Sequence, residues 1–76
     1  MITYNVGDRV YHRTMGYGTI VDIIEATTPE TNFTPETVEW FVVTRLESSH
    51  LTIRSKVKDT NRAEDLFFSA EEAAFG

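Results

Sequence analysis

Two glycines one residue apart, Gly16 and Gly18, constrain the fold of this chain more than any other feature. They separate two short segments, 9–13 and 19–25, that are rich in residues typical of β-strands. Glycine adopts positive φ at no steric cost and lets another backbone approach closely. Segment 14–18 is therefore predicted to reverse the chain tightly between two antiparallel strands, as at the first corner of a small β-barrel.

The second of these strands does not alternate strictly between polar and apolar residues. Its apolar residues stand at positions 20, 21, 23 and 24, around the polar Asp22. A bend or a β-bulge would let this strand change the face that it buries midway. The polar segment that follows, 26–37, contains two prolines and is interpreted as a loop. Phe33 is unusual in this loop, and it either pins the loop to the barrel or is exposed.

Two further segments predict strands from their alternation. Segment 38–47 places apolar residues at every second position, and Trp40 among them is favoured as a core residue. Segment 51–58 has one apolar side and one cationic side. Ser48 and Ser49 are predicted to form the hairpin turn between the two strands.

The C-terminal part of the chain predicts one more strand and a helix. Residues 62–68 are interpreted as a single 3₁₀ turn that leads into a short last strand at 66–68. Ser69 and Glu72 have the spacing of a helix cap, so a helix is predicted to begin there. A helix this short is not stable alone, so it must dock through Phe75 or fray.

The composition excludes several kinds of site. The chain has 76 residues, which fits one domain, and it has no cysteine. Disulfides, cysteine-based zinc sites and a cysteine nucleophile are therefore excluded. Small secreted domains usually need such cross-links, so a reducing, cytoplasmic location is expected. No apolar run approaches the ~20 residues that cross a bilayer, so no membrane partner is expected.

The charge of the chain is acidic overall and unevenly distributed. The net charge is −5. Residues 20–44 contain five acids and no Lys or Arg, whereas residues 45–62 contain five bases and two acids. Proteins that bind nucleic acid usually show a basic surface, because phosphate contacts dominate their affinity. The net charge therefore weighs against nucleic-acid binding, and the basic segment leaves it open.

The sequence offers little support for catalysis. A nucleophile, a base and an orienting group must meet in one pocket, and the serines stand in turn or cap contexts. The two histidines, His12 and His50, have no partner at metal-ligand spacing. His12 is predicted to be a hydrogen-bonded barrel residue, and His50 to be exposed. We therefore expect no enzymatic activity, no cofactor and no metal.

Two groups of side chains are candidates for binding a partner. Tyrosines on the side of the first strand away from the core are suited to recognition, because they offer large rigid area with a polar tip. The cations of segment 51–58 are either a solvated face, a contact for an acidic protein or a track for a nucleic-acid backbone. The candidate residues are Tyr11, Tyr17, Arg45, Arg54, Lys56 and Lys58.

The opening of the chain carries a family resemblance. Residues 6–12 (VGDRVYH) followed by 16–20 (GYGTI) resemble the opening of CarD-type RNA-polymerase-interacting domains. The same residues are similar to the Tudor-like C-terminal domains of UvrD-type helicases. Segment 62–66 (RAEDL) looks like the segment that closes those barrels.

The strand pattern and this resemblance together predict an all-β, SH3-like or Tudor-like small barrel of four to five antiparallel strands. Residues 1–76 would form this single domain, with 68–76 as a short helix or frayed tail. The resemblance implies a non-catalytic protein-binding module, an accessory or viral regulator that contacts RNA polymerase or another transcription or repair machine. Two alternatives stay open: nucleic-acid binding through the basic strand face 52–58, and self-association of strand edges into a homo-oligomer.

Overall fold

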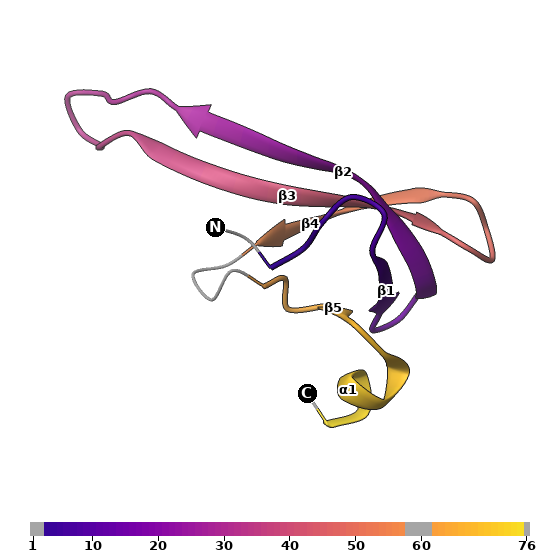
Figure 1. Cartoon of the computed structure of the whole chain (residues 1–76). Helices are drawn as coiled ribbons and strands as arrows, with labels where there is room; N and C mark the ends of the chain where they lie inside the picture. The colour runs from indigo at the N-terminus through magenta and orange to yellow at the C-terminus, as the bar shows by residue number, and fades with distance from the viewer. Residues whose placement is uncertain (1–2, 58–61, 76) are drawn as a thin grey trace.

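The structure, a computed structural model, describes residues 3–57 and 62–75. It contains an antiparallel sheet with the strand order β4-β3-β2-β1-β5 (Figure 1). The strands are β1 (Arg9–His12), β2 (Gly16–Thr28), β3 (Thr37–Leu46), β4 (Thr52–Val57) and β5 (Leu66–Phe67). A short helix, α1 (Ala70–Phe75), follows the last strand. The predicted small all-β fold with a short C-terminal helix is confirmed.

The sheet surrounds one small core. Each strand contributes a buried apolar residue to it, namely Val10, Ile20, Val42, Val57 and Leu66. Burying an aliphatic side chain of this size stabilises a fold by about 1.5–3 kcal/mol. Within the described residues no ladder joins the edge strands β4 and β5. Side chains therefore hold these two edges together across the core.

Tyr4 lies in the core between the two edges. Its side chain is buried in the same cluster as Val57 and Leu66. Its hydroxyl accepts a hydrogen bond from the N–H of Ala63 at 2.9 Å and donates one to the C=O of Leu66 at 3.3 Å. Its ring stacks on Phe68 with the ring centroids 5.5 Å apart. One residue near the N-terminus therefore fixes the C-terminal segment on the core.

The two glycines of the first corner have different roles. Gly16 has a φ of +88°, a conformation that favours glycine. Gly18 lies against β3, and a Cβ added there would stand 2.7 Å from the carbonyl oxygen of Arg45 and 2.7 Å from Cγ2 of Thr44. One glycine therefore permits the turn and the other permits close approach of two strands, which are the two properties predicted for them.

The turn between β1 and β2 is shorter than predicted. It occupies residues 13–15 instead of 14–18, and both glycines belong to β2. Gly16 pairs with His12 across the hairpin. The prediction was wrong because a glycine with positive φ at the end of a hairpin can still pair with the opposite strand.

β2 carries a β-bulge, one of the two irregularities that its sequence left open. Its ladder with β3 shifts register between Ile20 and Asp22, which leaves Val21 as the extra residue. Ile20 points into the core before the bulge, and Ile23 packs against the core after it. This spacing of three residues explains the broken alternation of the sequence, and the predicted change of face is confirmed.

The alternation predicted for the next two strands is also confirmed. The buried residues on the core side are Val42, Thr44 and Leu46 of β3 with Ser55 and Val57 of β4. Trp40 is half-buried against the same core. The residues between them point away from the core, on what we call the outer face of the sheet.

Segment 26–37 was wrongly predicted to be a loop throughout. β2 continues to Thr28 and β3 begins at Thr37, so β2 is three residues and β3 one residue longer here than expected, and the loop is confined to 29–36. Thr and Val favour strands, and their propensity extends the pairing up to the first proline. The result is a two-stranded hairpin, residues 25–39, that projects from the body of the sheet (Figure 1). We call it the arm.

The C-terminal segment follows the prediction with one correction. A turn at 64–65 leads into β5, and the Oγ of Ser69 accepts the N–H of Glu72 at 3.1 Å as the predicted helix cap. Phe75 does not dock, because 92% of it is exposed. The helix is held instead at its first turn, where Glu72 pairs with Arg62.

The hydroxyl of Tyr4 gives a first testable prediction. Tyr4→Phe removes both hydrogen bonds of a buried group and leaves the N–H of Ala63 without its partner. We expect a loss of about 1–3 kcal/mol in the free energy of unfolding, measured by urea denaturation.

The matched control is Tyr11→Phe, because no hydrogen bond of the Tyr11 hydroxyl is recorded within the described residues. This control should change stability by less than about 0.5 kcal/mol. Equal effects of the two substitutions would show that the Tyr4 hydroxyl does not fix the C-terminal segment.

Candidate functional site

Most of the candidate binding residues lie on the outer face of the sheet. These are Tyr11, Tyr17, Arg45, Arg54 and Lys56. The sixth candidate, Lys58, lies outside the described residues. Tyr11 stands opposite Tyr17 in the β1–β2 ladder, whereas Lys56 stands opposite Phe41 in the β3–β4 ladder. The structure therefore separates the set into an aromatic pair on one side and three cations on the other.

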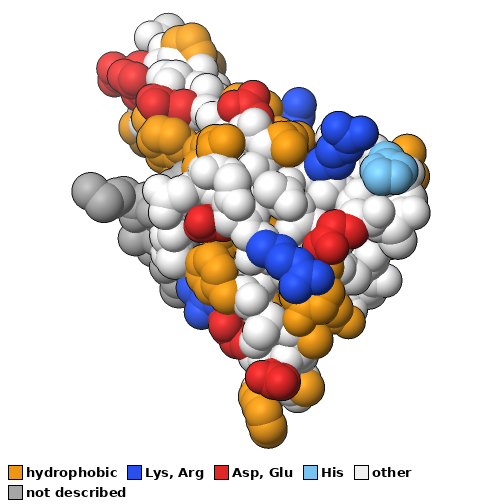
Figure 2. Space-filling view, turned by 45° about the vertical axis from the view of Figure 1, so that its right-hand side comes forward, with side chains coloured by type: hydrophobic (Ala, Val, Ile, Leu, Met, Phe, Trp, Pro, Cys, Tyr) orange, Lys and Arg blue, Asp and Glu red, His pale blue; other side chains and the backbone are white. Residues whose placement is uncertain are grey.

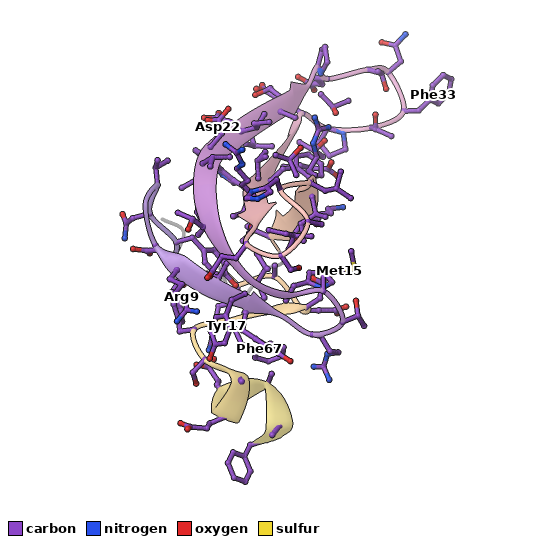
Figure 3. The ribbon with its side chains drawn as sticks, turned by 90° about the vertical axis from the view of Figure 1, so that its right-hand side faces the viewer. Arg9, Met15, Tyr17, Asp22, Phe33 and Phe67 are labelled. Atoms are coloured by element: carbon purple, nitrogen blue, oxygen red, sulfur yellow. The ribbon has the colours of Figure 1, made fainter. Side chains whose placement is uncertain are left out.

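The aromatic pair is part of a compact cluster. The rings of Tyr11 and Tyr17 meet edge to face with centroids 4.9 Å apart. The guanidinium of Arg9 lies 3.9 Å from the centre of the Tyr17 ring. The hydroxyl of Tyr17 accepts the N–H of Ala70 at 3.1 Å. Arg9, Tyr17 and Phe67 lie near one another in Figure 3. Tyr17 thus connects the sheet to the start of α1, a role that its sequence position did not reveal.

Arg9 is held over Tyr17 by an exposed ion pair. Nε of Arg9 donates to Oε2 of Glu47 at 2.9 Å, and Nη2 donates to Oε1 at 3.3 Å. The hydrogen bond from Arg9 lowers the pKa of Glu47, and the same bond raises the pKa of Arg9. Water and salt screen such a surface pair, so it orients the guanidinium more than it stabilises the fold.

The cations of β3 and β4 form a mixed surface. Arg54 lies over the ring of Phe41, with its guanidinium carbon 5.6 Å from the ring centre. Nζ of Lys56 pairs with Glu39 at 3.0 Å. Arg45 is exposed, and within the described residues no ion pair is recorded for it. Figure 2 shows basic side chains interspersed with acidic and hydrophobic ones on the face that it presents.

The arm carries the most exposed aromatic side chain of the described residues. Phe33 is 95% exposed and points away from the ribbon at the tip of the arm (Figure 3). Thr31 holds the tip in shape, since its Oγ1 accepts the N–H groups of Phe33 and Thr34 at 3.2 and 3.0 Å. The sequence left open whether Phe33 is pinned or exposed, and the structure shows it exposed. The sequence signal for this exposed side chain was an apolar residue between two prolines in a polar segment.

His12 is hydrogen-bonded on both ring nitrogens, as predicted. Its Nε2 lies 3.2 Å from Oδ2 of Asp65, and its Nδ1 accepts the N–H groups of Thr14 and Met15 at 3.2 Å each. These acceptor contacts place the neutral ring's proton on Nε2. The lone pair of Nδ1 therefore holds the β1–β2 turn. His50 is exposed, as predicted, and has a φ of +59° in the next hairpin turn.

A shallow hollow of about 630 Å³ lies beside β5 and is lined by Arg13 and residues 62–67. Both arginines in it are already engaged, Arg13 over the ring of Phe67 and Arg62 with Glu72.

The described residues contain no group of three or more His, Cys, Asp or Glu side chains that could hold a metal ion. In the same part of the chain, no helix is long and apolar enough to span a membrane.

Comparison with known proteins gives no relative: no family model matches the chain, and no curated protein or solved structure matches it.

The pair of Arg9 and Glu47 gives a second prediction. Because the folded pKa of Glu47 is lowered, its contribution to stability is present above the ordinary pKa of a glutamate and is lost as the pH falls through the lowered value. Arg9→Gln removes the charge, so the pKa of Glu47 should rise toward its ordinary value. An NMR titration of the Glu47 carboxyl measures this shift.

Arg54→Gln is the control, since Arg54 lies over an aromatic ring and not beside a carboxylate. It should leave the titration of Glu47 unchanged. An unaltered Glu47 titration in Arg9→Gln would mean that the pair does not persist in solution.

Proposed function

We propose that the chain is a non-catalytic protein-binding module whose arm engages another protein. The observation that carries this proposal is the 95% exposure of Phe33 at the tip of a projecting hairpin. A two-stranded hairpin is only marginally stable in water, and aromatic side chains are the usual anchors of protein interfaces. The exposed aromatic residue of the arm would leave water when it enters a pocket of the partner, and this burial would stabilise the complex.

The charge of the arm indicates the chemistry of that pocket. Glu30 and Glu36 each stand three residues from Phe33, and both are exposed. Residues 20–44 contain five acids and no base. Complementary charge steers association and fixes orientation. The partner is therefore proposed to offer an apolar pocket bordered by basic side chains.

The resemblance of residues 6–12 and 16–20 supports a setting for this interaction. It points to RNA polymerase or another transcription or repair machine as the partner, and to an accessory or viral regulator as the role. The resembling residues form the first corner of the sheet, whereas the arm is the element that we propose to make the contact.

A second candidate function is nucleic-acid binding through the cations of the outer face. It is favoured by the contact of Arg54 with Phe41, since cations beside aromatic rings can hold both phosphate and bases. Glu39 weighs against nucleic-acid binding, because its carboxylate already pairs with Lys56. The arm is the stronger candidate, since its aromatic residue has almost its whole surface free.

The arm gives a third prediction. Phe33→Ser should weaken binding to RNA polymerase purified from the same cells by about thirtyfold or more, which corresponds to the ~2 kcal/mol of an interface anchor. Fluorescence anisotropy of the labelled chain measures the affinity. Phe75→Ser is the matched control, because Phe75 is 92% exposed at the end of α1, which lies far from the arm (Figure 1).

Two outcomes would contradict this proposal. In the first, Phe33→Ser and the native chain bind the polymerase equally while Tyr17→Ala or Arg54→Ala lose binding, which would move the contact to the outer face. In the second, the polymerase binds neither the native chain nor any variant, and every protein that co-purifies with the native chain from cells also co-purifies with Phe33→Ser.

The nucleic-acid candidate gives a fourth prediction. Binding to DNA or RNA at low salt should fall steeply as salt rises, and Arg54→Ala should make this dependence shallower. A filter-binding series across salt concentrations measures both. No binding to single- or double-stranded DNA or RNA at low salt would remove this candidate.

A further inference from the structure

Among residues 3–57 and 62–75, the half of β2 beyond the bulge has a neighbour on one side only. Pairing with β1 ends at Thr19. At Ile20, the C=O accepts the N–H of Gly7, and the N–H donates to the C=O of Asp8. Residues 22–28 pair with β3 alone. In an antiparallel strand, alternate residues direct their N–H and C=O away from the neighbour. This stretch therefore presents a row of backbone groups to its free side.

That free edge carries only part of the usual protection. Natural edge strands are protected by charged side chains, Lys above all, by Pro, by bulges or by short length. Residues 22–28 contain Asp22 and Glu25 but no Lys, Arg or Pro, and they form a seven-residue edge. Within the described residues, one backbone group of this stretch is hydrogen-bonded to a side chain: the N–H of Ile23 donates to Oδ1 of Asp22 at 2.8 Å. The β2 edge is thus long, acidic and open.

The opposite edge of the sheet has the opposite charge. β4 pairs with β3 on one side, and in the part of the chain that the structure describes its other side has no backbone partner. Its outward residues include Arg54 and Lys56, of which Lys56 also pairs with Glu39 of the same copy, and the strand contains no acid. The sheet therefore has an acidic free edge of seven residues and a basic free edge of six.

These charges select which edges can meet. Like charges directly opposite each other destabilise a strand pair, and opposite charges stabilise it. Two β2 edges would bring together acidic arms, and two β4 edges would bring Arg54 against Lys56. The combination of one β2 edge with one β4 edge avoids both conflicts.

We infer that residues 22–28 of one copy bind β4 of a second copy as an added strand. With the outer faces on the same side, Asp22 and Ile24 of one copy alternate beside Arg54 and Lys56 of the next. Backbone hydrogen bonds supply the affinity of such strand addition. The inference rests on the proposed function only in treating the arm as an exposed binding element.

The contact is head-to-tail, and this has a consequence for size. Each copy uses its β2 edge on one side and leaves its β4 edge free for the next copy. An interface of this kind closes into a ring or continues as an open chain, and it does not stop at a symmetric dimer. The assembly is therefore expected to grow with concentration and to weaken as salt rises.

Reciprocal charge reversal gives the fifth prediction. Asp22→Lys places Lys against Arg54 of the next copy, and Arg54→Glu places Glu against Asp22. Each substitution alone should weaken association by about tenfold or more in sedimentation velocity, about 1.4 kcal/mol. Mixing the two variants restores an opposite pair at every contact, so assembly should return. A folding defect would not be repaired by mixing.

Glu71→Lys is the control, because Glu71 is exposed on α1, outside both edges, and it should leave assembly unchanged. A native chain that stays monomeric at high concentration and low salt overturns the inference, as does a species that stops at a dimer. Assembly that survives both charge reversals overturns it too. The proposed function is tested separately by polymerase binding of Phe33→Ser. Loss of that binding supports the proposed function, and persistence contradicts it.

Discussion

The buried hydroxyl of Tyr4 is the interaction on which the shape of this molecule depends. It joins residues 62 positions apart along the chain. The described ladders leave β4 and β5 unpaired with each other, and the ring of Tyr4 is buried in the cluster that contains Val57 of β4 and Leu66 of β5. An unpaired buried polar group is costly. The Tyr4 contact therefore also fixes where segment 63–66 lies and hence how β5 meets β1.

The body and the arm of the sheet are stabilised differently. Around the core every strand buries an apolar residue, and Gly18 lets β2 and β3 approach closely. Beyond the core, the arm has its ladder and little burial, since residues 25–38 are exposed. The part of the sheet that contributes least to the fold therefore presents the largest free aromatic surface, at Phe33.

The parts of the fold that depend on local alternation could be predicted, and the parts that depend on distant contacts could not. The two-sided pattern of β4 and the bulge in β2 follow from neighbouring residues. The length of the arm was missed because residues 26–28 gain their extended conformation by pairing with residues 37–39 across the hairpin. The docking of α1 was missed because it depends on Tyr17, 53 positions from its hydrogen-bond partner. Tyr17 was predicted to be a surface residue in the turn, and a position in a turn says nothing of what a hydroxyl contacts.

The extra residue at Val21 has a genetic consequence. Strand residues alternate between two sides, so one position more or less exchanges every side chain that follows. Val21 is an exception, because the bulge already takes it out of the ladder: loss of its codon would leave Asp22 opposite Val43 and Ile23 opposite Val42. Both sides of the projection would keep their side chains, so β2 can lose this one residue in a single evolutionary step without altering what the projection presents.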